Sequence, residues 1–126
     1  MLFGISHCAQ NDLSERLEER LKTIYYREST NREFRRYFSL LRKGKVLEKK
    51  GNEIRALDFY CTALFKYNPI GTDYYTRPAI IFERLKRYRE AIAVCEMHIK
   101  LAKHPDAHMD LDAAEERLAR LRKKCA

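Results

Sequence analysis

Two stretches of this chain carry large and small residues in the same order, 35 residues apart, and this period restricts the possible folds more than any other feature. A small residue on each helix of a pair lets the two helices approach closely. The period therefore predicts two helix–turn–helix units that stack on each other. The corresponding positions are Leu40 and Tyr75, Gly44 and Ala79, Leu47 and Phe82, Ala56 and Ala91, and Leu64 and Ile99.

Helix signals run along almost the whole chain, and no segment alternates apolar and polar residues for long. A capping-box pattern from Thr30 to Glu33 starts one helix, and Gly51 suits the end of that helix. The sequence therefore predicts an all-α fold, a stack of about six helices in a single helical domain, 1–126. The expected helices cover residues 12–28, 31 to the turn at Gly51, 53–67, 73–86, 89–103 and 107–124.

Pro78 lies several residues into the fourth expected helix. It has no N–H to donate, and it disfavours helical geometry at Arg77. Either this helix begins at Pro78 or residues 74–77 form a bent first turn. A bend would present Tyr74 or Tyr75 on the surface.

The repeated pattern resembles the tetratricopeptide repeat over roughly half of the chain. The resemblance implies a right-handed superhelix whose concave face holds peptides or partner helices. Two units are fewer than such stacks usually need, so helices 12–28 and 107–124 are expected to cap the stack, or a second copy of the chain does so. The first unit, 37–70, matches at Leu40, Gly44, Leu47, Gly51, Ala56, Tyr60, Ala63 and Pro69. The second, 72–105, matches at Tyr75, Ala79, Phe82, Tyr88 and Ala91, and departs at Cys95, His98 and Pro105.

The family register implies a partner-binding groove on the inner helix of each unit. In the alternative, the first helix packs inward and covers the apolar members of this set. Some family members clamp a C-terminal carboxylate with an Asn where this chain has Lys45 and Arg77, which disfavours that activity here. The implied groove residues are Phe38, Leu41, Lys45, Glu48, Asp73, Tyr74, Thr76, Arg77, Ile80 and Glu83.

The net charge of +8 is concentrated between Arg32 and Lys50. Arg36, Lys43 and Lys50 are seven residues apart and share one side of a helix. Such a basic ridge, comprising Arg32, Arg35, Arg36, Lys43 and Lys50, could neutralise about four phosphates of a nucleic acid. No recognition-helix turn or aromatic stacking platform accompanies it, so a solvated helix face is the alternative.

The sequence offers little support for catalysis or a metal site. It has no glycine-rich phosphate loop, no paired-carboxylate motif and no serine-centred elbow. His7 and Cys8 are adjacent, but no third group orients the histidine. Cys95 and His98, with two later histidines, lack the spacing of a zinc site, and Cys95 is expected in the core. We expect neither an enzyme nor a bound metal or cofactor.

The first residues do not form a signal peptide, and no run is long enough to span a membrane. Four scattered cysteines then indicate free thiols in the cytoplasm, without membrane association. We expect a protein–protein interaction adaptor or scaffold, monomeric or homodimeric, whose partner is a protein or peptide and whose basic ridge favours acidic partners. The alternatives are a nucleic-acid-associated helical protein that uses the ridge Arg32–Lys50, and a homodimeric structural subunit.

Overall fold

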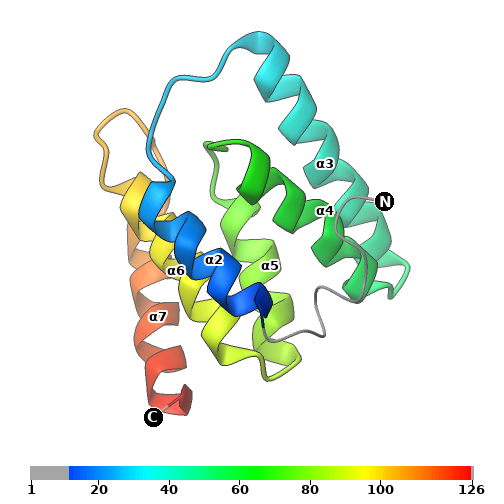
Figure 1. The fold of residues 1–126 in the computed structure, drawn as a ribbon, viewed down its shortest axis with the longest axis vertical. Helices are drawn as coiled ribbons and strands as arrows, with labels where there is room; N and C mark the ends of the chain where they lie inside the picture. Colours follow the sequence, from blue (N-terminus) through cyan, green and yellow to red (C-terminus); the bar gives the residue numbers. More distant parts are fainter. Residues whose placement is uncertain (1–11, 126) are drawn as a thin grey trace.

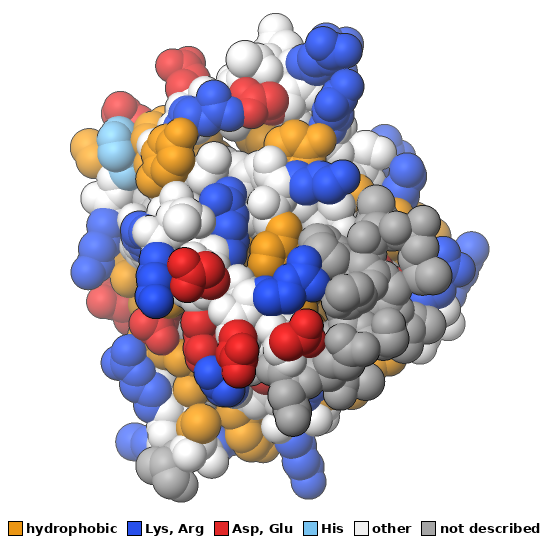
Figure 2. Space-filling model, viewed as in Figure 1, with side chains coloured by type: hydrophobic (Ala, Val, Ile, Leu, Met, Phe, Trp, Pro, Cys, Tyr) orange, Lys and Arg blue, Asp and Glu red, His pale blue; other side chains and the backbone are white. Residues whose placement is uncertain are grey.

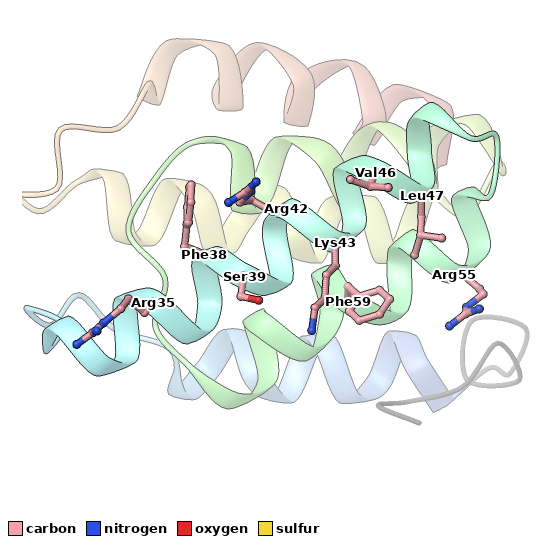
Figure 3. Close-up of a pocket in the computed structure, with 9 residues that line it drawn as sticks. All are labelled: Arg35, Phe38, Ser39, Arg42, Lys43, Val46, Leu47, Arg55 and Phe59. Carbon is pink, nitrogen blue, oxygen red and sulfur yellow. The ribbon is translucent and has the colours of Figure 1, made fainter.

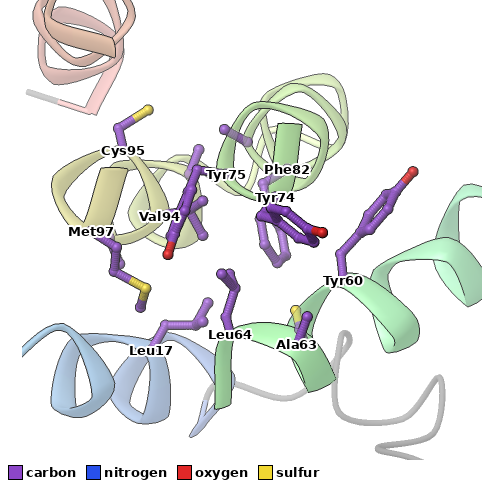
Figure 4. Close-up of a cluster of buried hydrophobic side chains, with 14 of the residues drawn as sticks. Leu17, Tyr60, Ala63, Leu64, Tyr74, Tyr75, Phe82, Val94, Cys95 and Met97 are labelled. Carbon is purple, nitrogen blue, oxygen red and sulfur yellow. The ribbon is translucent and has the colours of Figure 1, made fainter. Parts of the chain in front are cut away.

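The computed structural model describes residues 12–125, and within that range the chain forms six α-helices and no β-strand (Figure 1). The expected all-α fold, a stack of about six helices, is confirmed. The buried apolar side chains form one continuous cluster, part of which is drawn in Figure 4. The helices are α2 (Asp12–Thr23), α3 (Asn31–Lys49), α4 (Glu53–Lys66), α5 (Asp73–Arg84), α6 (Tyr88–Ala102) and α7 (Leu111–Cys125).

Helix ends that the sequence marks with a capping residue lie where they were expected. The Thr30 hydroxyl accepts a hydrogen bond from the Glu33 N–H at 3.1 Å, and the Glu33 carboxylate accepts one from the Thr30 N–H at 3.1 Å. These two bonds complete the capping box of α3. Asn52 caps α4 by accepting from the Arg55 N–H at 3.2 Å. Gly51, with φ of +82°, makes the left-handed turn between the two helices.

Helix α2 ends at Thr23, whereas the sequence pattern predicts an end at residue 28. A contact with another helix explains the difference. Lys100 Nζ of α6 donates to the carbonyl of Leu21 at 2.8 Å and to that of Lys22 at 3.2 Å. A longer helix would pair these carbonyls internally, so the tertiary contact replaces the next turn of the helix.

Helix α7 begins at Leu111, whereas the sequence predicts a start at residue 107. The Asp110 carboxylate accepts a hydrogen bond from the Ala113 N–H at 3.0 Å, so Asp110 acts as the helix cap. His108 has φ of +51°, which lies outside the helical region. The segment between α6 and α7 is therefore a turn.

The helices pack as two pairs followed by a single helix. Helix α3 packs on α4, α5 on α6, α4 on α5, and α7 on α6. The predicted close approach is confirmed at Gly44, where a Cβ atom would lie 2.3 Å from Cε1 of Tyr60. Ala56, Ala79 and Ala91, the other small residues of the period, are buried.

Helix α2 packs on α6 and α4, the second helix of each pair (Figure 1). Its Leu17 points toward Leu64 of α4 and Met97 of α6 in Figure 4. Arg20 reaches the C-terminal end of α4, where it donates to the carbonyls of Leu64 and Tyr67, each at 2.7 Å. The first helix therefore lies beside the stack and does not cover the α3–α5 face. The alternative, in which this helix packs inward over the apolar groove residues, is wrong.

Pro78 lies inside α5, which begins at Asp73. The first-turn bonds are present upstream of it, since the N–H groups of Tyr75 and Thr76 both donate to the Thr72 carbonyl, at 3.1 and 3.0 Å. The alternative in which the helix starts at Pro78 is therefore wrong. Tyr75 is fully buried, and its hydroxyl donates to a backbone carbonyl at 2.6 Å.

Candidate functional site

The groove residues predicted on α3 and α5 do come together, but their charges pair with one another. Lys45 Nζ of α3 lies 2.5 Å from the Asp73 carboxylate of α5. One turn further along, Glu48 of α3 accepts a hydrogen bond from Arg77 Nε of α5 at 2.9 Å. Both ion pairs join α3 to α5.

Glu48 is the centre of a polar network that joins α3, α4 and α5. Its side chain is 9% exposed, and it also accepts a hydrogen bond from the Tyr60 hydroxyl at 2.6 Å. The guanidinium of Arg84 lies 3.7 Å away. Burial raises the pKa of Glu48, but hydrogen bonds from Arg77 and Tyr60 outweigh burial and hold the pKa below its usual value. Glu48 is therefore ionised and fully engaged in holding three helices together.

The predicted groove residues at the other side of α5 face α7. Glu83 accepts hydrogen bonds from Arg117 at 3.2 Å, Arg120 at 3.0 Å and Lys124 at 3.0 Å. The hydrogen bond from Arg120, the largest cause, lowers the pKa of Glu83 to about 2. Thr76 lines a cavity of about 20 Å³ between α5, α6 and α7. This part of the predicted groove is thus covered by the last helix.

The apolar members of the predicted groove serve mainly in packing. Leu41 and Tyr74 are buried, and Tyr74 meets Tyr37 edge to face with 5.1 Å between ring centroids. Ile80 is half-buried. Only Phe38, at 41% exposed, is an open apolar side chain. A ligand on the α3–α5 face would therefore have to break or share the ion pairs there.

A different depression opens between α3 and α4, and we call it the α3–α4 groove. Its volume is about 620 Å³. Figure 3 shows it running along α3, with Arg35 near one end and Arg55 near the other, and with Phe59 of α4 in the opposite wall. The groove is lined by Arg35, Phe38, Ser39, Arg42, Lys43, Val46, Leu47, Arg55 and Phe59.

The charges of the α3–α4 groove are all positive. None of its four cations, Arg35, Arg42, Lys43 and Arg55, forms an ion pair within the described residues. Lys43 Nζ lies over the Phe59 ring at 6.0 Å from its centroid, which keeps the cation at the groove wall. The lining therefore combines unpaired positive charge with apolar surface and offers no acidic group.

The five residues of the predicted basic ridge are all exposed: Arg32, Arg35, Arg36, Lys43 and Lys50. Arg35 and Lys43 belong to both the ridge and the groove. Basic side chains follow the upper right edge of Figure 2, where α3 lies in Figure 1, and acidic side chains gather over α2. The ridge thus lies beside the groove and extends its positive charge along α3.

Sequence reasoning missed most of the groove lining, although one signal was present. Phe34, Phe38 and Val46 of α3 are apolar and 45%, 41% and 51% exposed. Together with the buried Tyr37 and Leu41, they give α3 an apolar arc wider than α4 alone can cover. Such a wide arc indicates a helix with a second, uncovered apolar side.

Other candidate chemistry finds no support in the described residues. Residues 12–125 contain no group of three or more His, Cys, Asp or Glu side chains that could hold a metal ion. Cys95 is buried as expected, and burial raises the pKa of its thiol to about 11. His7 and Cys8 lie outside the described residues. No helix in residues 12–125 combines the length and apolar character needed to cross a membrane.

Comparisons of this chain with protein-family models, with curated proteins and with solved structures found no match. The resemblance to the tetratricopeptide repeat therefore stays a prediction.

Proposed function

We propose that this protein is a protein–protein interaction adaptor that binds a segment of a partner in the α3–α4 groove. The observation that carries the proposal is the row of open apolar side chains on α3, Phe38 and Val46 in particular, beside a groove of about 620 Å³. Exposed apolar surface of this kind, rimmed by polar residues, is typical of interaction sites.

The position of the groove supports this proposal. The α5–α6 pair has a further helix, α7, packed on it, whereas the groove side of the α3–α4 pair has no helix over it within the described residues. A helical pair that ends a stack exposes a face that a neighbour would otherwise bury. We therefore place the proposed binding site on the open side of the α3–α4 pair. The α3–α5 face, which the sequence predicts, is less suitable because its charged side chains already form ion pairs with one another.

A nucleic-acid partner is the second candidate, and the basic ridge beside the exposed Phe34 and Phe38 favours it. These two rings stack on each other with 5.5 Å between centroids, so their faces are partly used within the protein. The third candidate, a homodimer through this surface, would bring like charges together, which disfavours it. The exposed free thiol of Cys125 suits a reducing compartment, so the proposal includes a cytoplasmic location.

Site-specific photo-crosslinking tests the proposed function. The photoreactive amino acid benzoylphenylalanine replaces Phe38 in one variant, Val46 in a second and Tyr25 in a control, because Tyr25 is an equally open side chain outside the groove. Captured segments are identified by mass spectrometry, synthesised and titrated against the purified protein.

We expect both groove positions to capture the same segment, and the Tyr25 position not to capture it. The synthetic segment should bind the purified protein and bind less well to Val46→Asn. Capture that does not differ between the groove and the control, or a synthetic segment that does not bind, would refute the proposed function.

A further inference from the structure

We propose that the segment that occupies the α3–α4 groove is an acidic amphipathic helix of the partner protein. This inference rests on the proposed function and names the chemistry of its ligand. It follows from three observations: the shape of the groove, the placement of its apolar side chains and the sign of its charge.

The shape of the groove fits a helix. Its α3 lining recurs at the three- and four-residue spacing of one helix face, from Arg35 to Leu47. At a rise of 1.5 Å per residue this face is about 18 Å long, or somewhat more than three turns. Arg55 and Phe59 of α4 form the opposite wall. Two adjacent helices with a groove between them give a third helix a track in which its side chains can interlock.

The apolar side chains lie where such a helix would place its own. Phe38 and Val46 stand two turns apart on α3, and α4 contributes Phe59 to the same groove (Figure 3). A guest helix with apolar residues at positions i, i+3 or i+4, and i+7 would cover all three. Val46, at 51% exposed, has the largest exposed fraction of the three.

The charge of the groove determines the sign of the ligand. Arg35, Arg42, Lys43 and Arg55 flank the apolar strip and have no ion-pair partner within residues 12–125. Glu and Asp on the sides of the guest helix would pair with them. A second copy of this chain would present the same four cations, and a nucleic acid would leave the aliphatic side chain of Val46 without an apolar partner.

The test uses designed peptides and fluorescence anisotropy. The probe is a labelled 20-residue peptide with Leu at helix-face positions and Glu on both flanks. Three matched peptides control for its features: one with Lys in place of every Glu, one with the same composition in scrambled order, and one with two central prolines. A labelled single-stranded RNA and a DNA duplex of similar length are measured beside them, all near 150 mM salt.

Two charge-reversed variants separate the groove from the general charge of α3. Arg42→Glu with Lys43→Glu changes two cations of the groove. Arg32→Glu with Arg36→Glu makes the same change of charge on the same helix, at exposed positions outside the groove. We expect the first pair to weaken binding of the acidic peptide at least tenfold, and the second pair to weaken it by less than threefold.

The neutral variant Val46→Asn tests the apolar contact without a change of charge, and we expect it to weaken binding about tenfold. The peptide should gain helical circular dichroism on binding, and the proline peptide should not bind. Equal binding of the acidic and scrambled peptides would overturn the inference. So would RNA or DNA binding that exceeds peptide binding at this salt concentration, or light scattering that gives twice 15.1 kDa for wild type and a monomer for Val46→Asn.

The inference and the proposed function fail in different ways. If crosslinking from Phe38 and Val46 identifies a bound segment that is neither acidic nor helical, the ligand inference falls and the adaptor function stands. If crosslinking finds no segment, the adaptor function falls as well.

Discussion

Substitution of Gly44 by alanine tests the closest contact in the fold. Gly44 lies inside α3 and faces the ring of Tyr60 on α4. An added Cβ atom would lie 2.3 Å from Cε1, 2.7 Å from Cζ and 2.8 Å from Cδ1 of that ring. All three distances are far below van der Waals contact. Either the ring moves or the two helices separate.

The ring has little freedom to move. Tyr60 is 1% exposed, and its hydroxyl donates to the largely covered carboxylate of Glu48 at 2.6 Å. Overpacking in a core costs about 1–3 kcal/mol, and loss of a hydrogen bond to a charged group costs about 1.5–3 kcal/mol. The higher helix propensity of alanine offsets about 1 kcal/mol of this. We therefore expect Gly44→Ala to lower the free energy of unfolding by about 1.5–5 kcal/mol.

Urea denaturation followed by circular dichroism measures the effect, with a double-mutant cycle as the control. In a Tyr60→Leu background the clashing ring atoms are absent, so Gly44→Ala should be neutral or stabilising there. Ser39→Ala, at an exposed position of the same helix, should leave stability within about 0.5 kcal/mol of wild type. A Gly44→Ala protein as stable as wild type, or equally destabilised in both backgrounds, would refute the assignment of the contact.

Three further substitutions probe other parts of the stack. Arg20→Met removes two charge-assisted hydrogen bonds to α4 and should lower the free energy of unfolding by about 2–4 kcal/mol, with faster hydrogen exchange in α2. Glu48→Gln leaves Arg77 without its charge partner and should cost about 2 kcal/mol in the same urea assay, whereas unchanged stability would show that the network contributes nothing. Burial lowers the pKa of His98, so the unfolded chain takes up a proton first as the pH falls. The contribution of His98 to the free energy of unfolding should be complete above the ordinary histidine pKa of about 6.5. Below that pH it should decline by at most about 1.4 kcal/mol per pH unit. His98→Leu should remove this decline between about pH 5 and 8.

Local sequence signals were sufficient for the helices and for some of their ends. The capping box at Thr30 and Glu33 and the turn at Gly51 act through neighbouring residues, so they can be read from the sequence alone. The end of α2 at Thr23 and the start of α7 at Leu111 could not be predicted as reliably. The first is fixed by Lys100 on a distant helix, and the start of α7 depends on which of several polar residues becomes the cap.

The predicted binding site shows where the repeat register fails as a guide. Lys45 and Glu48 of α3 lie beside Asp73 and Arg77 of α5, and the register predicts which side of each helix points inward. The register does not predict which charged side chains form ion pairs, since each pair joins a residue of α3 to a residue of α5. The ion pairs across α3 and α5 therefore appear only once the distance between these helices is known.

The distribution of charge along α3 connects the stability of the stack with its proposed binding surface. Both acidic residues of this helix pair with arginines from outside it, Glu33 with Arg27 and Glu48 with Arg77. Arg35, Arg42 and Lys43 of the same helix form no ion pair within the described residues, and they border the open apolar strip. Stability and the proposed binding thus depend on different sides of one helix. Because Val46 is 51% exposed, Val46→Asn should change the free energy of unfolding by less than about 0.5 kcal/mol while it weakens peptide binding. Equal loss of both would mean that the groove side also holds the stack together.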